Sequence, residues 1–547
     1  MRSTFASLEI GRRSIMAHQS ALNVTGHNVA NVNTPGYTRQ DAVMVTTPPY
    51  CTPSLNSGIQ VGQFGTGVQV SDIRRLRDDF IDLQIRDENR TTGYWQSMEM
   101  ALDKIEVVLN EPTKEGLRGV LDSFWSSWQA LSESPENESV RAVVLQRGHA
   151  VVDTFNHMYA QLADLRQDLN AQVKARVDEV NSMAQQIADL NQQIQAITIS
   201  GQRPNDLTDS RDLLLDQLSE IVDTHIVPEV DGMVTVMVGG TPLIQGINHS
   251  RMGLNTDAQG LYKVVWDLHP EEHPGTSITG NGVDAADPEV VLQSGALLGL
   301  LDARGQADNS TPGGRGLVPG LIEDLNLMAK TLVLSTNYVH RQGYSLNNTT
   351  DDADGFNFFV QPDDVTEVIE WAKLIEISKD IADNPQNIAA AKEPTYKVLV
   401  DDDGNPVDEE GNLIEEGGEP VLVPTNFGDG ANALKIAQIK HYLFTAVDQD
   451  EYQGGSIITG GTIDDFWRSQ VSTVGVLAQE ARRMVENQET LVSQLELKRQ
   501  ATAGVSLDEE MMNMIRFQHA YNAAARYITT IDETIEVIVN RMGLVGR

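Results

Sequence analysis

The sequence has only one cysteine, Cys51, in a chain of 547 residues. A lone cysteine excludes an intrachain disulfide framework and a zinc site built from clustered cysteines. No run of about 18 apolar residues occurs, which excludes a bilayer-spanning helix. The first 30 residues lack the continuous apolar core and the small-residue cleavage site of a secretory signal. We therefore expect a protein that stays in the cytoplasm or leaves it by an unconventional route.

Basic residues are also scarce, since 40 Lys and Arg stand against 78 Asp and Glu, a formal net charge of -38. Phosphate backbones repel such a chain, which argues against nucleic acid as its main ligand. Residues 1–100 carry nine acidic and nine basic side chains, a net charge of zero, and residues 351–424 carry twenty and four, a net charge of -16. Neutral ends can pack in many copies, whereas an acidic middle favours solvent. A drift in composition between domains explains the same contrast.

The internal patterns predict several domains. At roughly 150 residues per domain, the chain has room for about three or four. Heptad patterns within 155–199 and 467–495 predict two long helices, and their similar length predicts that they pair antiparallel as a rod. Further helices are expected at 297–301 and 321–339, and strands at 233–238, 261–268, 396–400 and 421–423. The predicted fold class is multidomain and mainly α, with β-rich outer modules.

The C-terminal end carries the strongest helical pattern. Apolar residues recur every seven positions in two series offset by three, which is typical of a coiled-coil seam. Ser506 is a suitable N-cap, and Glu509 three residues later completes a capping box. The two series are Met514, Tyr521, Ile528, Ile535 and Met542, and Phe517, Ala524, Ile531, Ile538 and Val545.

The N-terminal end carries a narrower seam. Leu8, Ile15, Leu22 and Val29 repeat every seven residues, whereas the companion positions Thr4, Gly11, His18 and Thr25 are small or polar. A turn should end this helix, because Asn tolerates left-handed backbone and Pro-Gly favours a type II turn. The turn residues are Asn31, Asn33, Pro35, Gly36 and Tyr37. Together with the C-terminal series, the two seams predict that the ends pack against each other and against neighbouring subunits.

No constellation for chemistry emerges, and we predict neither an enzyme nor a bound cofactor or metal. His269 and His273 enclose Pro270, which disfavours the helix that a zinc protease site needs. Residues 401–412 begin like a calcium loop, but Pro406 and Asn412 replace the required Gly and Glu. The glycines at 62–67 lack the Lys-Ser/Thr of a phosphate loop. Cys51 has no convincing histidine partner.

Two terminal segments closely resemble the signatures of bacterial flagellar rod, hook and hook-associated proteins. They are ALNVTGHNVANVNTPGYTRQ at 21–40 and VSLDEEMMNMIRFQHAYNAAARYITTIDETI at 505–535. The segment RPNDLTDSRDLLLDQLSEIV at 203–222 resembles the hallmark of those members that form the first part of the hook–filament junction. The segment FGDGANAL at 427–434 is similar to a second family stretch. The resemblance covers most of the chain, and residues 392–424 look like an insertion relative to shorter members.

The resemblance implies a structural axial protein of the extracellular flagellum, exported without a cleaved signal through the flagellar type III apparatus. Its terminal helices would form coiled coils of the inner tube and its middle domains would face outward. The implied partners are further copies of the chain, the hook protein, the second hook–filament junction protein and an export chaperone on the C-terminal helix. Neither nucleic acid binding nor membrane insertion is implied.

Together these inferences predict four parts. Residues 1–75 with 505–547 form the terminal coiled-coil domain, and 76–225 with 425–504 form the helical rod. Residues 226–345 form a mixed β and helical part, and 346–424 form an acidic inserted outer module.

The alternatives to a junction protein are a hook or distal rod protein, a flagellin, a cytoplasmic coiled-coil scaffold, or a surface-displayed enzyme. The 155–199 helix and the 203–222 segment argue against hook and rod proteins, and Thr34-Pro-Gly-Tyr37 argues against flagellin. The paired signatures argue against a scaffold, and the lack of histidine in 345–430 argues against the enzyme.

Overall fold

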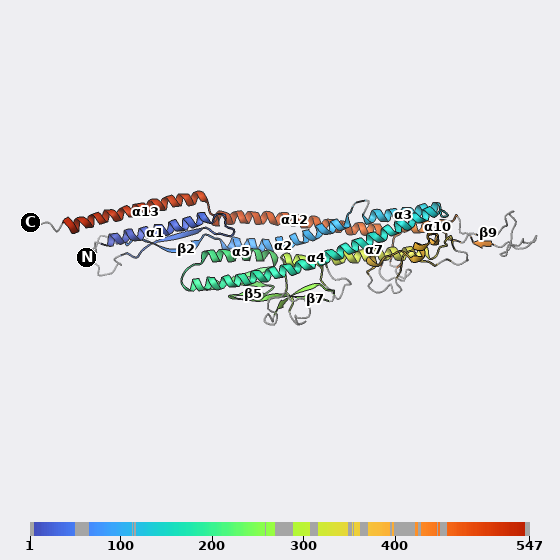
Figure 1. Ribbon diagram of the computed structural model, residues 1–547, viewed down its shortest axis with the longest axis horizontal. Helices are drawn as coiled ribbons and strands as arrows, with labels where there is room; N and C mark the ends of the chain where they lie inside the picture. Colours follow the sequence, from blue (N-terminus) through green and yellow to red (C-terminus); the bar gives the residue numbers. More distant parts are fainter. Residues whose placement is uncertain are drawn as a thin grey trace, which may run out of the picture.

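The chain forms an elongated body with both termini at the same end (Figure 1). Paired terminal helices make up that end, long helices run through the middle, and small sheets lie along one side of the middle. The computed structural model describes residues 5–49, 65–111, 113, 116–257, 259–267, 288–306, 316–347, 353, 355–361, 370–393, 396–398, 422–424, 428–445, 447–448 and 457–541.

Helices dominate the described residues. The helices are α1 (Ala6–Ala30), α2 (Asp79–Leu109), α3 (Leu117–Glu133), α4 (Glu138–Ile199), α5 (Asn205–Ile221), α6 (Ala296–Arg304), α7 (Leu317–His340), α8 (Trp371–Leu374), α9 (Lys379–Asp383), α10 (Ala431–Gln438), α12 (Ile463–Ala503) and α13 (Leu507–Glu536), which continues as a π-helical turn over Val537–Arg541. The strands are β1 (Gln40–Thr46), β2 (Val68–Arg75), β3 (Thr224–Pro228), β4 (Val234–Val238), β5 (Thr241–Gln245), β6 (Asn248–His249), β7 (Arg251–Thr256), β8 (Tyr262–Asp267), β9 (Tyr396–Val398) and β10 (Leu422–Pro424). The predicted fold class, multidomain and mainly α, is confirmed.

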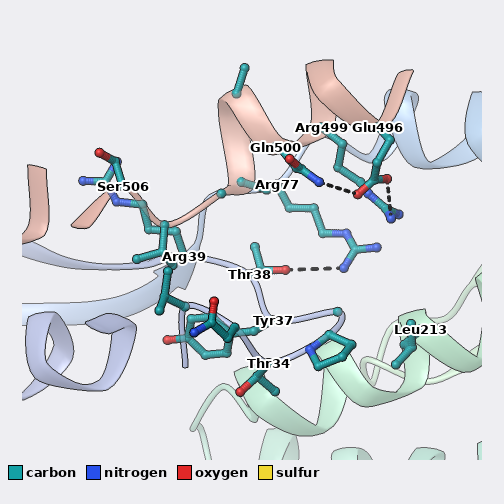
Figure 2. A pocket seen from close by; sticks show the side chains of 18 of the residues that line it. Thr34, Tyr37, Thr38, Arg39, Arg77, Leu213, Glu496, Arg499, Gln500 and Ser506 are labelled. Atoms are coloured by element: carbon teal, nitrogen blue, oxygen red, sulfur yellow. Dashed lines mark hydrogen bonds and ion pairs between the residues drawn. The ribbon is translucent and has the colours of Figure 1, made fainter. Parts of the chain in front are cut away.

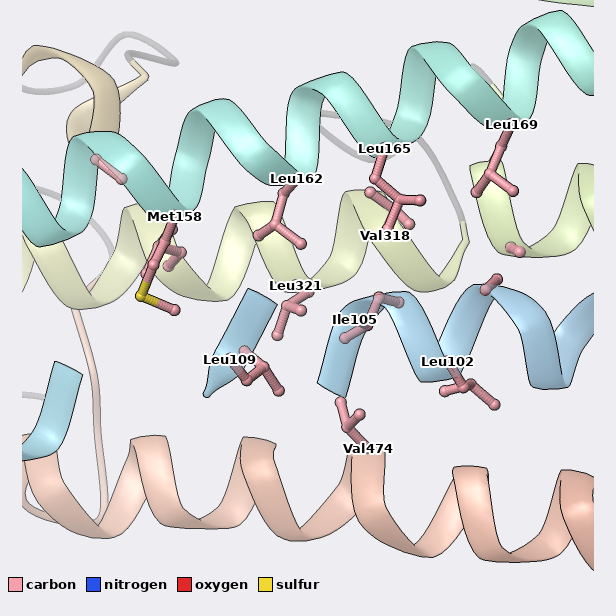
Figure 3. Close-up of a cluster of buried hydrophobic side chains, with 14 of the residues drawn as sticks. Leu102, Ile105, Leu109, Met158, Leu162, Leu165, Leu169, Val318, Leu321 and Val474 are labelled. Carbon is pink, nitrogen blue, oxygen red and sulfur yellow. The ribbon is translucent and has the colours of Figure 1, made fainter. Parts of the chain in front are cut away.

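Both predicted long helices exist, but the prediction that they pair with each other is wrong. Helix α12 packs chiefly against α2, which lies between α12 and α4 (Figure 3). Arg482 of α12 pairs with Asp103 and Glu106 of α2, and Arg499 lies near Asp82, so the two helices are antiparallel. The apolar stripe of α2 is interrupted by small and polar residues, and therefore its sequence gives only a weak helical signal.

The core of the rod lies where four of these helices meet. Side chains from α2, α4, α7 and α12 are buried there against one another, and apolar burial of this kind stabilises by about 1.5–3 kcal/mol for each large side chain. Figure 3 shows the meeting point with Leu102, Ile105 and Leu109 of α2, Met158, Leu162, Leu165 and Leu169 of α4, Val318 and Leu321 of α7, and Val474 of α12.

Small antiparallel sheets dock along α4. Strands β3 to β6 form one sheet in sequence order, and β7 pairs with β8. The strands predicted at 233–238 and 261–268 are confirmed as β4 and β8, and Gly239 and Gly240 form the predicted turn with φ of 55° and 84°. The expected hairpin near residue 400 is confirmed by the pairing of β9 with β10.

Three asparagines of α4, spaced about three helical turns apart, hold these strands. Asn181 exchanges two hydrogen bonds with the backbone of Met252, at 2.8 and 2.9 Å. Asn191 donates to the carbonyl oxygens of Val234 and Gly246 at 2.9 and 2.7 Å, and Asn170 accepts from the amide of Tyr262 at 2.9 Å. An amide side chain can replace a strand's backbone partner in this way, and the sheets therefore sit in a fixed register on the helix.

The predicted division into four parts stays a prediction. The limit at 75/76 coincides with the end of β2, whereas the limit at 225/226 falls inside β3. Several segments of the sequence argument lie outside the described residues. They are Cys51, Gly62, the histidines at 269 and 273, the calcium-loop-like stretch at 401–412, and Met542 and Val545 of the seam.

Candidate assembly interface and elbow

Helices α1 and α13 form an antiparallel pair, and the predicted C-terminal seam lies on the side of α13 that faces α1. Ile528 lies next to Gly11, and the rings of Phe517 and His18 have centroids 6.3 Å apart. Ala524 is buried, and Ile538 is exposed at 47%. The remaining described seam residues on α13 are half-buried, namely Met514, Phe517, Tyr521, Ile528, Ile531 and Ile535.

On α1, one of the companion positions, Gly11, closely approaches α13. A Cβ atom added to Gly11 would lie 2.5 Å from Cγ1 of Ile528, which is closer than real Cβ contacts. The predicted aliphatic positions of α1 flank this contact at helical spacings of three and four residues. They are all half-buried, namely Leu8, Ile15, Leu22 and Val29. The assembly role predicted for these four residues stays a prediction, and in the structure they lie beside the Gly11 contact.

The turn after α1 has the predicted form. The amide of Asn31 donates to the carbonyl oxygen of His27 and ends the helix, and the amide of Tyr37 donates to Thr34 at 3.2 Å. Gly36 has a φ of 76°, which the third residue of a type II turn requires. A Cβ at Gly36 would lie 3.1 Å from Cβ of Leu213, so the turn rests on α5. Asn33 and Pro35 are exposed.

A polar cluster with a buried centre joins this turn to both terminal helices. We call Asn28, Tyr37, Arg39, Glu509 and Glu510 the elbow cluster. Asn28 is 1% exposed; its amide donates to Glu510 at 3.1 Å, and its carbonyl oxygen accepts from the Tyr37 hydroxyl at 2.8 Å. Glu510 is 2% exposed and pairs with the Arg39 guanidinium at 2.8 Å. Burial, helped by nearby acidic groups, raises the pKa of Tyr37 above its usual range, so the hydroxyl stays a donor.

Arg39 also connects α12 to α13. Its backbone amide donates to the carbonyl oxygen of Ala503 at 2.9 Å and so satisfies a group at the open end of α12. Its guanidinium binds Glu509 and Glu510 in the first turn of α13, each at 2.8 Å. Ser506 caps α13 as predicted, because its hydroxyl oxygen accepts a hydrogen bond from the amide of Glu509 at 3.5 Å. One residue of the N-terminal segment thus bridges the short link between the two C-terminal helices.

A second, larger charged cluster lies directly beneath, where α5 meets β2, α2 and α12. Arg75 pairs with Asp209 and Asp212 at 2.7 and 2.8 Å, and the amide of Thr38 donates to Asp209 at 2.9 Å. Asp216 joins two helices, because it binds Arg86 of α2 and Arg499 of α12 at 2.7 and 2.6 Å. Burial acts to raise the pKa of Asp212, but the nearby guanidinium groups outweigh it, and the pKa lies below its usual value.

A groove opens at this elbow (Figure 2). The turn at 32–39 forms one wall, Leu213 and Asp216 of α5 form the floor, and the last turns of α12 with the link to Ser506 form the other wall. The segments quoted for the resemblance, 21–40, 203–222 and 505–535, therefore meet at one place although more than 150 residues separate each from the next. Sequence reasoning missed this meeting point; the available signal was the three Asp and two Arg residues within 203–212.

Metal-binding groups and membrane-spanning helices were both sought among the described residues. These residues contain no group of three or more His, Cys, Asp or Glu residues that could hold a metal ion. No helix among them is long and apolar enough to cross a membrane. The buried charged groups at the elbow are paired with one another and face neighbouring elements of the same chain, which is the arrangement of a structural joint.

Three family models match the chain. They are the flagellar hook-associated protein FlgK helical domain at residues 102–359, the flagellar basal body rod FlgEFG protein C-terminal at 499–542 and the flagella basal body rod protein at 8–38. The two terminal matches fall on α1 with its turn and on the end of α12 with α13. These matches, on an elongated fold with paired terminal helices, define a structural axial protein of the bacterial flagellum.

Full-length relatives make the assignment specific. The chain is 34% identical over 553 residues to flagellar hook-associated protein 1 of Bacillus subtilis strain 168, with both chains covered completely. It is 26% identical to flagellar hook-associated protein 1 of Escherichia coli K12, over 96% of this chain and 97% of the relative. The chain belongs to the flagellar hook-associated protein 1 family.

A solved structure shares the fold. It is the flagellar hook junction protein FlgK from Burkholderia pseudomallei, with a TM-score of 0.55, 16% sequence identity, and coverage of 77% of this chain and 100% of the other. At this identity the likeness concerns the fold alone. It agrees with the mainly helical, multidomain architecture described above.

Proposed function

We propose that this chain forms the hook–filament junction as a mechanical adaptor on which the filament assembles. The observation that carries the proposal is the half-covered seam of α13. Six seam residues remain half-buried because α1 covers them from one side, and Ile538 is exposed at 47%. Among the described residues, α13 packs chiefly against one helix, α1, and a sustained heptad seam covered in this way can accept a second helix from a neighbouring copy.

The shape of the molecule supports the same arrangement. Both termini lie at one end, and the rod extends away from them (Figure 1). If the nearly neutral ends pack into an inner tube, the acidic middle points to solvent. Contacts between different surfaces of identical copies extend helically and do not close into a dimer.

The proposal includes specific partners. They are further copies of this chain, the hook protein on one side and the second hook–filament junction protein on the other. Before assembly, an export chaperone covers the C-terminal helix, whose exposed residues include Met511, Met512 and Ile515. The chain leaves the cell through the flagellar type III apparatus without a cleaved signal. It acts as a structural protein without enzymatic activity or cofactor, and it neither binds nucleic acid nor inserts into a membrane.

A hook or distal rod protein is the alternative within the same class. The long helix α4 and the α5 segment at the elbow favour the junction protein, because both lie within the hook-associated helical domain match. A cytoplasmic scaffold would explain the seams but not the paired terminal signatures.

A charge placed in the seam tests the assembly surface. Ile528→Asp should leave the rod folded, because Ile528 lies in the terminal helix pair beside Gly11, but it should block incorporation into flagella. The matched control is Asn522→Asp, which places the same charge at an exposed position of the same helix. Secreted variant protein and flagellar incorporation are both measured. Normal incorporation of Ile528→Asp would remove the seam from the proposal.

Electron microscopy of cells that lack this chain tests the junction role itself. Hooks without filaments, with flagellin lost to the medium and filaments restored by a plasmid copy, are the expected result. Absent hooks would move the chain to the rod or hook. Intact motile filaments would contradict the proposal as a whole.

A further inference from the structure

A histidine lies at the centre of the contact between the rod and the outer segments. His340 is the last residue of α7 and is 0% exposed. Its Nδ1 lies 2.8 Å from the carbonyl oxygen of Phe356, and the backbone amide of Ala389 lies 3.0 Å from its Nε2. A carbonyl oxygen only accepts and an amide N–H only donates. The neutral ring must therefore carry its proton on Nδ1 and accept at Nε2.

Among the described residues, none that contacts the His340 ring carries a negative charge. The rings of Trp128 and Phe358 lie at centroid distances of 6.3 and 5.8 Å. The charged group that acts on His340 is the guanidinium of Arg141, itself buried and bound to the carbonyl oxygens of Pro135 and Ile388 at 2.8 and 2.6 Å. Among the described residues, no carboxylate lies within ion-pairing distance of Arg141; Glu136 acts on it only from farther away.

We propose that His340 is an acid-sensitive latch, which holds residues 356–359 and 386–391 against the end of α7 and releases them when the ring is protonated. Protonation would place an Nε2–H against the Ala389 N–H and so replace a hydrogen bond by the contact of two donors. It would also put a second buried cation near Arg141. A buried charge without a partner is costly, so opening the segment to water is the favourable way to accommodate the proton.

The direction of the pH dependence follows from burial. Burial, opposed by the Phe356 hydrogen bond and aided by Arg141, lowers the pKa of His340 from 6.5 to about 4. The closed state binds fewer protons than the open state, so it is fully favoured above the open-state pKa and loses stability as pH falls. Between the open-state pKa and the closed-state pKa, the equilibrium constant for opening should rise about tenfold for each unit by which the pH falls. This inference concerns the outer segments and is independent of the assembly role proposed above.

Hydrogen exchange of the purified full-length chain tests the latch. After correction for intrinsic rates, the Ala389 amide and the Ser378 amide, which donates to Phe358, should lose protection about tenfold per pH unit from pH 6 to 4.5. Core amides of α4 should not change. Constant protection of Ala389 over this range would overturn the proposal.

Variants separate His340 from other groups that titrate. His340→Gln keeps an oxygen that can accept from Ala389 but cannot be protonated, so the acid-dependent step should vanish. His157→Gln, at an exposed position of α4, should keep it. The same acid step in His340→Gln would refute the latch.

If that variant does not fold, the protonation of the wild-type His340 ring is followed by ¹⁵N NMR as a function of pH. Ring protonation should coincide with the loss of exchange protection at the Ala389 amide. Protonation near pH 6.5 without opening would contradict the latch.

Discussion

Gly11 is the position at which the packing of the terminal helices can be tested most directly. Replacing a helical glycine by alanine normally stabilises the helix by about 1 kcal/mol. Here the new Cβ would lie 2.5 Å from Cγ1 of Ile528. That atom is close to the backbone of a β-branched side chain, which cannot swing away freely. Overpacking of this kind costs about 1–3 kcal/mol. We therefore expect Gly11→Ala to destabilise the α1–α13 pair by about 0–2 kcal/mol.

A double-mutant cycle with Ile528 isolates this contact. Ile528→Ala removes Cγ1 and, because the side chain is only half-buried, should cost less than the roughly 2–5 kcal/mol of a fully buried isoleucine. In the double variant the alanine at position 11 fits without a clash, and the helix stabilisation expected of a Gly→Ala replacement is recovered. The coupling energy between the two positions should therefore be favourable by about 1–3 kcal/mol.

Gly26 provides the matched control on the same helix. No atom lies within 4 Å of a Cβ added there, so Gly26→Ala should stabilise α1 by about 1 kcal/mol and show no coupling to Ile528. The measurement is hydrogen exchange of amides in α1 and α13, converted to local opening free energies. Equal stabilisation by Gly11→Ala and Gly26→Ala would refute the close approach and the register derived from it.

Three further predictions address the polar joints. Glu510→Gln should lower the opening free energy of the first turns of α13 by about 1–3 kcal/mol, measured by hydrogen exchange, whereas Glu509→Gln, which is half exposed, should change it by less than about 1 kcal/mol. Asn191→Ala should lower the stability of the β3–β6 sheet by about 1–3 kcal/mol in thermal unfolding, because two carbonyl groups lose their donor. The pKa of Asp212 is lowered, so its contribution is present above the ordinary Asp pKa and is lost as pH falls through the lower folded value. Exchange protection of α5 should therefore persist at pH 4 and fall on further acidification, and Asp212→Asn should be less stable already at pH 7.

The elements that could be predicted from sequence are helices whose apolar residues recur at a regular spacing and whose ends are marked by capping residues. The heptads of α4 and α13 and the Ser506 cap predicted helices because long apolar stripes leave few alternatives. The partner of α12 could not be predicted in the same way. The buried face of α2 includes Gly93, whose absent side chain lets α2 approach the backbone of Glu220. Small residues that serve close packing carry little hydrophobic signal.

The polar contacts were hidden for a related reason. A polar side chain on a helix is usually solvent-exposed, and no period distinguishes Asn191 from its exposed neighbours. Asn191 holds the sheet because the carbonyl groups of Val234 and Gly246 lie within hydrogen-bond distance of its side chain, and only the tertiary structure determines that position. The same holds for Asp209 and Asp212. The resemblance marked their segment, but the guanidinium groups that bind them come from β2 and from the link between β2 and α2.

The elbow also bears on how the chain could transmit force. The link between α12 and α13 is short, and a Cβ at Gly504 would lie 2.4 Å from the carbonyl oxygen of Gln500. Arg39 spans this link with a backbone bond to α12 and charged bonds to α13. The charged hydrogen bond to the buried Glu510 contributes about 1.5–3 kcal/mol and the exposed one to Glu509 contributes less, so bending at the link must break contacts worth several times the thermal energy. We therefore expect a stiff elbow, in which a change of angle between the rod and the terminal helices requires the N-terminal segment to move with them.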